Sequence, residues 1–178
     1  MHKQKIIAVV FILLTCTCAF SQSGWQVVSD SIPNFYIETI QMTSVNKGYA
    51  CGTIVNSSSG SFLKTTNGGL NWQRTDYSTY SVDDISFLND LTGYAIGFAY
   101  SPLPGYYTGK ILKTTDGGNS WAKSDSISYG NFFKIKFYDI NTGFIAGKNG
   151  QLYVTTNGGI NWINRTLAFY WHEPQGLW

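Results

Sequence analysis

Cysteine and histidine are scarce in this chain of 178 residues. Cys16 and Cys18 lie in an apolar N-terminal segment, so Cys51 stands alone in the rest of the chain and cannot form an intramolecular disulfide. The two histidines are His2 and His172, near the ends of the chain. No His, Cys and Asp residues have metal-site spacing, no serine has the context of a nucleophile, and no glycine-rich phosphate loop opens a helix. The sequence therefore predicts no catalytic residue, no metal site and no cofactor.

An excess of charge of one sign is also missing. Lys3 and Lys5 belong to the N-terminal segment, which leaves ten basic and ten acidic residues in the remainder. A balanced chain has no basic field to attract phosphates. Nucleic acid and anionic membrane surfaces are therefore excluded as partners, while a protein or a glycan remains possible.

No long apolar run is present that would span a bilayer. The run Ile6–Leu14 has nine residues, follows two lysines and precedes small residues, which is the pattern of a secretory signal peptide. We predict a signal peptide over residues 1–21 with cleavage after Ser21, and a mature chain that is secreted, periplasmic or on the cell surface. A lipoprotein is the alternative, although the threonines before Cys16 and Cys18 fit a lipobox poorly.

The chain is rich in repetition instead. An eight-residue segment, here called the repeated turn, reads TTNGGLNW at 65–72, TTDGGNSW at 114–121 and TTNGGINW at 155–162. Its Asn or Asp can accept hydrogen bonds from backbone N–H groups further along, and its two glycines supply positive φ. Apolar residues precede each copy and a new extended run follows the tryptophan, so each copy is predicted to be the turn of a β-hairpin.

A second segment repeats in step with the first. It reads MTSVNKGYACG at 42–52, FLNDLTGYAIG at 87–97 and FYDINTGFIAG at 137–147. Before it, apolar residues alternate with polar ones, as in the pair Ile85 and Phe87, which is the period of a half-buried strand. One unit is therefore four strands in about 45 residues, the size of a propeller blade. Cys51 aligns with Ile96 and Ala146, so we expect it to be a small buried residue.

The repeated turn resembles the Asp-box, or BNR repeat, which joins the two outer strands of a propeller blade. The resemblance implies an all-β fold, a β-propeller of four-stranded antiparallel blades with Asp-box hairpins. It also implies that the box residues are structural rather than catalytic: Asn67, Trp72, Asp116, Trp121, Asn157 and Trp162.

The combination of both segments is most similar to the photosystem II stability/assembly factor family and to secreted bacterial proteins of that kind. The resemblance covers nearly all of the chain after residue 21. It implies a propeller scaffold that binds other proteins during assembly, without catalysis. In photosynthetic members an arginine-rich patch is implicated in partner contact, and this chain has only Arg74 and Arg165 for such a patch.

Counting strands predicts three blades and the start of a fourth within residues 22–178, with units at about 25–72, 73–121, 122–162 and an incomplete 163–178. Trp25–Val28 matches the fourth strand of a blade, and Trp178 matches the last residue of a blade's first strand. Three blades cannot close a ring, since propellers use 4–8. We expect a fragment of a longer propeller, and a short form that closes by oligomerising is the alternative.

Strand order assigns the loops to two faces. The repeated turns share one face with the turns between first and second strands, whereas the opposite face carries loops of variable length, the longest at Ala99–Gly109. Eight of the twelve tyrosines fall on this variable face. Tyrosine suits partner surfaces because its rigid ring ends in a polar group. The candidate partner-binding residues are Tyr77, Tyr80, Tyr100, Tyr106, Tyr107, Tyr129, Tyr170 and Trp171, with Tyr36 and His172 nearby.

Two functions follow from this reading. The first is a secreted, non-catalytic propeller that binds a protein or a glycan and acts as an assembly scaffold. The alternative is an Asp-box glycoside hydrolase, sialidase-like or a glucanase, with catalytic carboxylates partly in blades that are missing here. Asp83 and Asp84 are adjacent but point to opposite sides of a strand, so they make a poor acid–base pair.

Overall fold

The computed structural model describes residues 34–77, 80–100 and 107–166, without the side chain of Tyr100. The predicted signal peptide, the Trp25–Val28 strand and the start of a fourth blade lie outside these residues. Almost all of the described regular structure is β-strand, and its one helical turn is the 3-10 turn η1, Lys148–Gly150.

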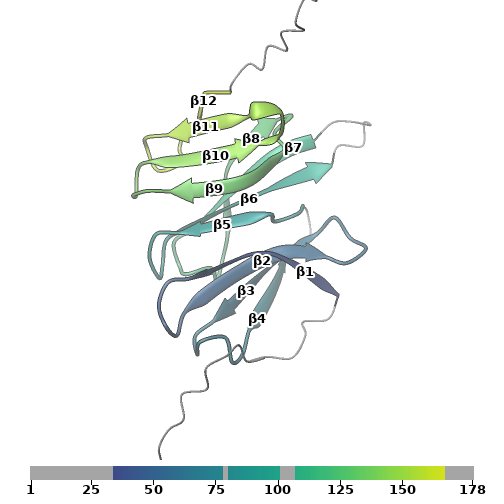
Figure 1. Ribbon diagram of the computed structural model, residues 1–178, viewed down its shortest axis with the longest axis vertical. Coiled ribbons are helices and arrows are strands. Elements are labelled where there is room, and N and C mark those ends of the chain that lie inside the picture. The colour runs from purple at the N-terminus through teal and green to yellow at the C-terminus, as the bar shows by residue number, and fades with distance from the viewer. Residues whose placement is uncertain (1–33, 78–79, 101–106, 167–178) are drawn as a thin grey trace, which may run out of the picture.

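Three antiparallel sheets of four strands stack along the long axis of the molecule (Figure 1). Each sheet is a meander in which sequential strands are neighbours. The first blade comprises β1 (Phe35–Met42), β2 (Gly48–Ile54), β3 (Gly60–Thr65) and β4 (Gln73–Tyr77). The second comprises β5 (Asp84–Phe87), β6 (Gly93–Tyr100), β7 (Tyr107–Thr114) and β8 (Ala122–Ser128). The third comprises β9 (Phe132–Phe137), β10 (Gly143–Gly147), β11 (Leu152–Thr155) and β12 (Ile163–Asn164).

The repeated turn joins the third and fourth strands of each blade, as predicted. In the first copy Gly68 and Gly69 have φ of 70° and 89°, which only glycine adopts without strain. The Asn67 side-chain oxygen accepts the N–H of Asn71 at 3.0 Å, and Thr65 Oγ1 accepts the N–H of Gly69 at 2.9 Å. The second and third copies repeat this pattern, with Asp116 bonded to Ser120 N–H and Asn157 to Asn161 N–H. The turn is thus held by its own polar atoms.

The two faces have the loops that strand order assigns to them. The N–H of Gly117 donates to the carbonyl of Leu91, which places the repeated turn beside the turn between first and second strands. The other two blades make the same bond. On the opposite face the N–H of Ser81 donates to the carbonyl of Phe98, so the connection into β5 lies beside the end of β6.

Aromatic stacking joins successive blades. Tyr49 stacks on Phe87 of the second blade with ring centroids 3.6 Å apart, and Tyr94 stacks on Phe137 of the third blade at the same distance. Trp121 from the second repeated turn stacks on Phe62 at 4.3 Å and completes the first interblade core. Each such pair contributes about 0.5–1.5 kcal/mol beyond its buried area. Cys51 is fully buried in this core, as expected, and burial raises the pKa of its thiol well above the ordinary value.

The first strands of successive blades are also linked by side-chain hydrogen bonds. The Gln41 amide on β1 both accepts the N–H of Phe87 and donates to its carbonyl, at 2.8 and 2.9 Å. On β5, Ser86 Oγ accepts the N–H of Phe137 at 3.0 Å, and Asp84 accepts the N–H of Ile135 at 2.9 Å. Burying a polar side chain costs free energy unless the side chain is hydrogen-bonded. These hydrogen bonds therefore offset that cost and also fix the spacing of neighbouring blades.

The glycines of the second repeated segment permit this close approach. A Cβ on Gly97 would lie 1.8 Å from the backbone oxygen of Ser81, and a Cβ on Gly93 would lie 2.7 Å from the ring of Phe87. Only a residue without a side chain fits at either position. The segment therefore repeats because each blade needs the same two contacts.

Candidate functional site

An open groove of about 640 Å³ crosses the variable face. We call it the three-blade groove, because its residues come from the loops and strand starts of all three blades. Its small polar residues are Thr53, Ser57, Ser58, Ser81 and Asn131, its aromatic residues are Phe98, Tyr107, Phe132 and Phe133, and its charged residues are Glu38, Asp83, Lys134 and Lys148. A groove of this size can hold a drug-sized molecule or a short peptide segment.

The charges in the groove are separated by blade. The acidic residues Glu38 and Asp83 come from the first and second blades, whereas the basic residues Lys134 and Lys148 come from the third. The Lys134 ammonium lies 3.2 Å from a carboxylate oxygen of Asp84, but 63% of its side chain stays exposed. Lys134 can therefore contact a ligand as well as its structural partner. A ligand lying along the groove would meet acidic groups at one end and basic groups at the other.

Asp83 is the most perturbed titratable group of the groove. Burial is the main cause that raises its pKa, to about 7, and Glu38 and Asp84 raise it further. The Ser81 hydroxyl donates to its Oδ2 at 3.2 Å, which opposes the rise. Asp83 therefore changes charge near neutral pH, and perturbed groups of this kind gather at functional sites. Its neighbour Asp84 bonds the backbone of β9 instead, so the two carboxylates have separate surroundings, as their strand positions predict.

The predicted tyrosines whose side chains the structure describes have different surroundings. Tyr77 and Tyr80 pack against the first interblade core, where Tyr77 meets Phe62 edge to face at 6.1 Å. Tyr107 lines the three-blade groove, and Tyr129 is exposed at the turn before β9. The side chain of Tyr100, and all of Tyr106, Tyr170 and Trp171, lie outside the described residues. Whether these tyrosines bind a partner stays a prediction.

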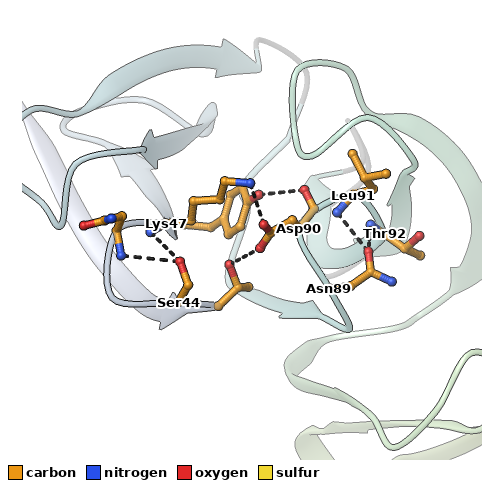
Figure 2. A network of polar contacts seen from close by, with 9 residues as sticks. Ser44, Lys47, Asn89, Asp90, Leu91 and Thr92 are labelled. Carbon is orange, nitrogen blue, oxygen red and sulfur yellow. Dashed lines mark hydrogen bonds and ion pairs between the residues drawn. The ribbon is translucent and has the colours of Figure 1, made fainter.

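The opposite face carries a small polar network between the first two blades. The Lys47 ammonium and the Thr43 hydroxyl both donate to the carboxylate of Asp90, at 2.5 and 2.9 Å. Figure 2 shows the Lys47 side chain extended toward Asp90. The Tyr49 hydroxyl donates to the Asp90 carbonyl at 3.1 Å. The pKa of the Asp90 carboxyl is lowered, chiefly by the hydrogen bond from Lys47. Both charged side chains are over two-fifths exposed, so the pair fixes turn geometry more than it adds stability.

A second, smaller cavity of about 100 Å³ lies between the first two blades. Its walls include Phe62, Lys64, Asn119 and Trp121. The indole N–H of Trp121 is buried and has no hydrogen-bond partner among the described residues. The cavity is polar enough and large enough for ordered water.

Metal ligands do not gather anywhere in the part of the chain that the structure describes, where no group of three or more His, Cys, Asp or Glu side chains could hold an ion. Within the same residues, no helix has the length and hydropathy needed to cross a membrane. The arginines lie away from the groove, with Arg74 on the outer strand β4 and Arg165 just after β12.

The three-blade groove lies on the face that strand order assigns to the variable loops, and Tyr107 is the one predicted partner-binding residue among its described lining residues. Glu38, Lys134 and Lys148 gave no signal, because single charged residues at strand ends are ordinary surface positions. Phe133 breaks the alternation of β9 by standing next to the buried Phe132, and it is half exposed at 51%. Besides Tyr107, that adjacent aromatic pair is a sequence feature that could have indicated the groove.

Comparison with solved structures places the fold among β-propellers. One similar structure is YCF48 bound to D1 peptide, with a TM-score of 0.58 and 23% sequence identity over 74% of this chain and 40% of that one. Another is YCF48 from Cyanidioschyzon merolae, with a TM-score of 0.56 and 25% identity over 75% and 41%. YCF48 is a photosystem II assembly factor with a β-propeller fold. The three sheets described here are therefore consecutive blades of a partial propeller.

The chain spans about two fifths of the length of these two solved structures. No protein-family model matches the sequence. No curated protein matches it either.

Proposed function

We propose that this chain belongs to a non-catalytic β-propeller scaffold that binds an extended segment of a partner protein in the three-blade groove. The observation that carries the proposal is the groove itself, which runs across three blades with acidic residues on the first two and basic residues on the third. We also propose that the protein is secreted, periplasmic or on the cell surface, after cleavage near Ser21.

A peptide fits this chemistry better than a glycan. Peptides carry both signs of charge along one chain and can pair with the acidic and the basic residues of the groove, whereas neutral sugars offer no charged group to Glu38, Asp83 or Lys148. The aromatic rings of Tyr107 and Phe133 offer apolar contact area at low cost in side-chain entropy. YCF48 has a D1 peptide bound in one of the similar structures. That likeness supports a protein partner for this fold, and the charges of this groove define which peptide is favoured.

A hydrolase is the less favoured function. A sialidase holds its substrate carboxylate with three arginines, and the groove of this chain is lined by none. Asp83 is a candidate proton donor because its pKa lies near neutrality, but its near neighbour Asp84 is occupied in bonding β9. This groove chemistry and the likeness to YCF48 both support the proposal of a non-enzymatic scaffold.

The test is a binding measurement with charge-patterned peptides and the full chain. We would label twelve-residue peptides that carry lysines in one half and glutamates in the other, separated by tyrosine and glycine, and measure fluorescence anisotropy at low ionic strength. The reversal Lys134→Glu with Lys148→Glu should weaken binding by roughly tenfold or more, because two rim charges then repel the acidic half. Lys123→Glu on β8, outside the groove, is the matched control and should leave affinity within about twofold.

An equal loss of peptide affinity in the control and in the double variant would contradict the proposal. Failure of every charge-patterned peptide to bind the parent chain would contradict it as well. The same preparation should be assayed on sialosides and β-glucans. If the protein hydrolyses one of these substrates and Asp83→Asn abolishes that activity, the protein is a glycoside hydrolase and not a non-catalytic scaffold.

A further inference from the structure

The first strand of each blade has an irregularity at the same place. In β1 the register with β2 shifts between Ile37 and Thr39, so Glu38 has no partner across the sheet. In β9 the register with β10 shifts at the equivalent step, which leaves Phe133 without such a partner. A β-bulge of this kind takes the side chain of the extra residue out of the regular alternation and re-aims it.

The second blade has the same irregularity at Asp83, just before β5. The N–H of Asp83 donates to the carbonyl of Ile96 at 2.8 Å, although Ile96 pairs with Asp84 in the register of β5 and β6. Two successive residues thus face one residue of the neighbouring strand, which is the pattern of a bulge. Asp83 is therefore the equivalent of Glu38 and Phe133, and we call these three the bulge residues.

All three bulge residues line the three-blade groove. One structural position in each described blade thus supplies one side chain to the same surface. Two residues further on, all three strands have an isoleucine, whereas the bulge residues differ in chemistry. A position that varies within a repeated frame and faces a groove is suited to recognising a ligand.

We infer that the bulge residues form a subsite for an arginine side chain of the partner, an inference that rests on the proposed peptide-binding function. A guanidinium is planar and carries five donors, so it can hydrogen-bond carboxylates and stack on an aromatic ring at the same time. Glu38 and Asp83 supply the carboxylates, and Phe133 supplies a ring that is 51% exposed. Lysine carries the same charge without the planar face, so arginine is favoured.

The two acidic bulge residues have no cationic partner among the described residues. Neither Glu38 nor Asp83 forms an ion pair there, and Lys134 pairs with Asp84 instead. Burial raises the pKa of Asp83 to about 7, and the nearby Glu38 carboxylate raises it further. A guanidinium in contact with both carboxylates would relieve their repulsion, so this part of the groove favours a cation.

A buried hydroxyl positions Asp83 for this contact. Ser81 is 5% exposed, accepts the N–H of Phe98 at 3.1 Å and donates to Asp83 Oδ2 at 3.2 Å. Within the described part of the chain, Ser81 is the one side chain that hydrogen-bonds this carboxylate. Most of the acceptor positions of the carboxylate therefore remain for a ligand.

Fluorescence anisotropy with the full chain and the charge-patterned peptides tests the inference. Three peptides differ at one position of the basic half, which holds arginine, lysine or citrulline, the neutral isostere of arginine, and no other charge. The measurement is made at pH 8, where Asp83 is ionised because its pKa is about 7. The parent should bind the arginine peptide roughly tenfold more tightly than the citrulline peptide, and more tightly than the lysine peptide.

Variants of the bulge residues should change these ratios of affinity. Glu38→Gln with Asp83→Asn should reduce the ratio of arginine to citrulline to about twofold or less, because the carboxylates that distinguish the two are gone. Phe133→Leu keeps an apolar side chain without the ring and should remove the preference for arginine over lysine. The matched controls are Asp125→Asn on β8 and Phe144→Leu on β10, which do not line the groove and should leave both ratios within about twofold of the parent.

Each ratio compares two peptides on one preparation, so partial unfolding of a variant changes both affinities equally. The inference is overturned if the parent binds all three peptides equally, or if the ratio of arginine to citrulline stays high in the double variant. An unchanged preference of Phe133→Leu for arginine would overturn the role of the ring. If Lys134→Glu with Lys148→Glu still weakens binding in those cases, the proposed function stands without this subsite. If no peptide binds the parent, the proposed function fails and the inference fails with it.

Discussion

At the residue scale, three copies of one turn use either Asn or Asp for the same task. The side-chain oxygens of Asn67, Asp116 and Asn157 each accept the backbone N–H four residues ahead. An amide oxygen and a carboxylate oxygen can both accept this hydrogen bond from the same position, so Asn and Asp can replace each other in the turn. The carboxylate differs in one respect, because it titrates. Hydrogen bonds from Ser120, first from its hydroxyl and then from its N–H, lower the pKa of Asp116 to about 2.

The prediction at this scale concerns acid stability. A pKa that is lower in the folded chain than in the unfolded chain adds stability above about pH 3.8, and this stability is lost as the pH falls toward 2. Asp116→Asn should therefore lose less unfolding free energy between pH 4 and pH 2 than the parent. Urea titrations at these pH values would measure it. Asn67→Asp is the matched opposite and should steepen the loss. Parallel pH curves for all three chains would show that the turn carboxylate is not linked to folding.

At the element scale, the units of stability are the junctions between blades. Tyr94 contributes to its junction in two ways, by stacking on Phe137 at 3.6 Å and by donating its hydroxyl to the buried carbonyl of Gly158 at 3.0 Å. Lys113 lies over the same ring, with its ammonium 5.1 Å from the ring centroid. One side chain thus joins β6, the first strand of the third blade and its repeated turn.

Substitutions at Tyr94 should separate these contributions. Tyr94→Phe keeps the stack and removes the hydroxyl, so it should lower the free energy of unfolding by about 1 kcal/mol. Tyr94→Ala also removes the ring and should lower it by roughly 3–5 kcal/mol. Tyr138→Ala, at a ring that is 84% exposed, is the control and should stay within about 0.5 kcal/mol of the parent. Chemical unfolding followed by tryptophan fluorescence measures all three, and equal effects of Phe and Ala would contradict the importance of the stack.

Strands and turns could be predicted closely from the sequence, because the repeat gives three aligned readings of each position. The alternation around Ile85 and Phe87 indicated the first strands, and the glycine pairs indicated the hairpins. The direction of the tyrosine side chains could not be predicted. A tyrosine ring is apolar, so Tyr77 and Tyr80 near a loop can pack inward as readily as outward, and here both pack on the core. The groove was missed because its charges come together only when three blades stack.

At the scale of the whole molecule, the blades form a row in which each sheet packs on the next. The first strand of each following blade packs on the first two strands of the blade before it, so β5 contacts β1 and β2, and β9 contacts β5 and β6. Residues of the first and third sheets both line the three-blade groove. Arrays of this kind have stabilities that sum over units and nearest-neighbour junctions.

Hydrogen exchange should show this independence. Tyr49→Ala weakens only the junction between the first two blades, so amide exchange should accelerate in β1–β3 and β5. The amides of β10 and β11, which lie beyond the second junction, should keep their protection. Mass spectrometry of peptic peptides resolves the two regions. Tyr94→Ala should shift the acceleration to the second and third blades, and uniform acceleration in both variants would indicate one cooperative unit instead.

A blade added to this row, or removed from it, meets the same residues at both new junctions. At both described junctions a tyrosine of one blade stacks on a phenylalanine of the next, and Gly93 and Gly143 leave room for those phenylalanine rings. Because the repeated turn recurs at the same place in each blade, unequal crossing-over between its coding segments would delete or duplicate whole blades in frame and would keep this pair of positions at the new junction. The number of blades is then a quantity that lineages can change in a single genetic event, while the stacking rule between blades is inherited intact.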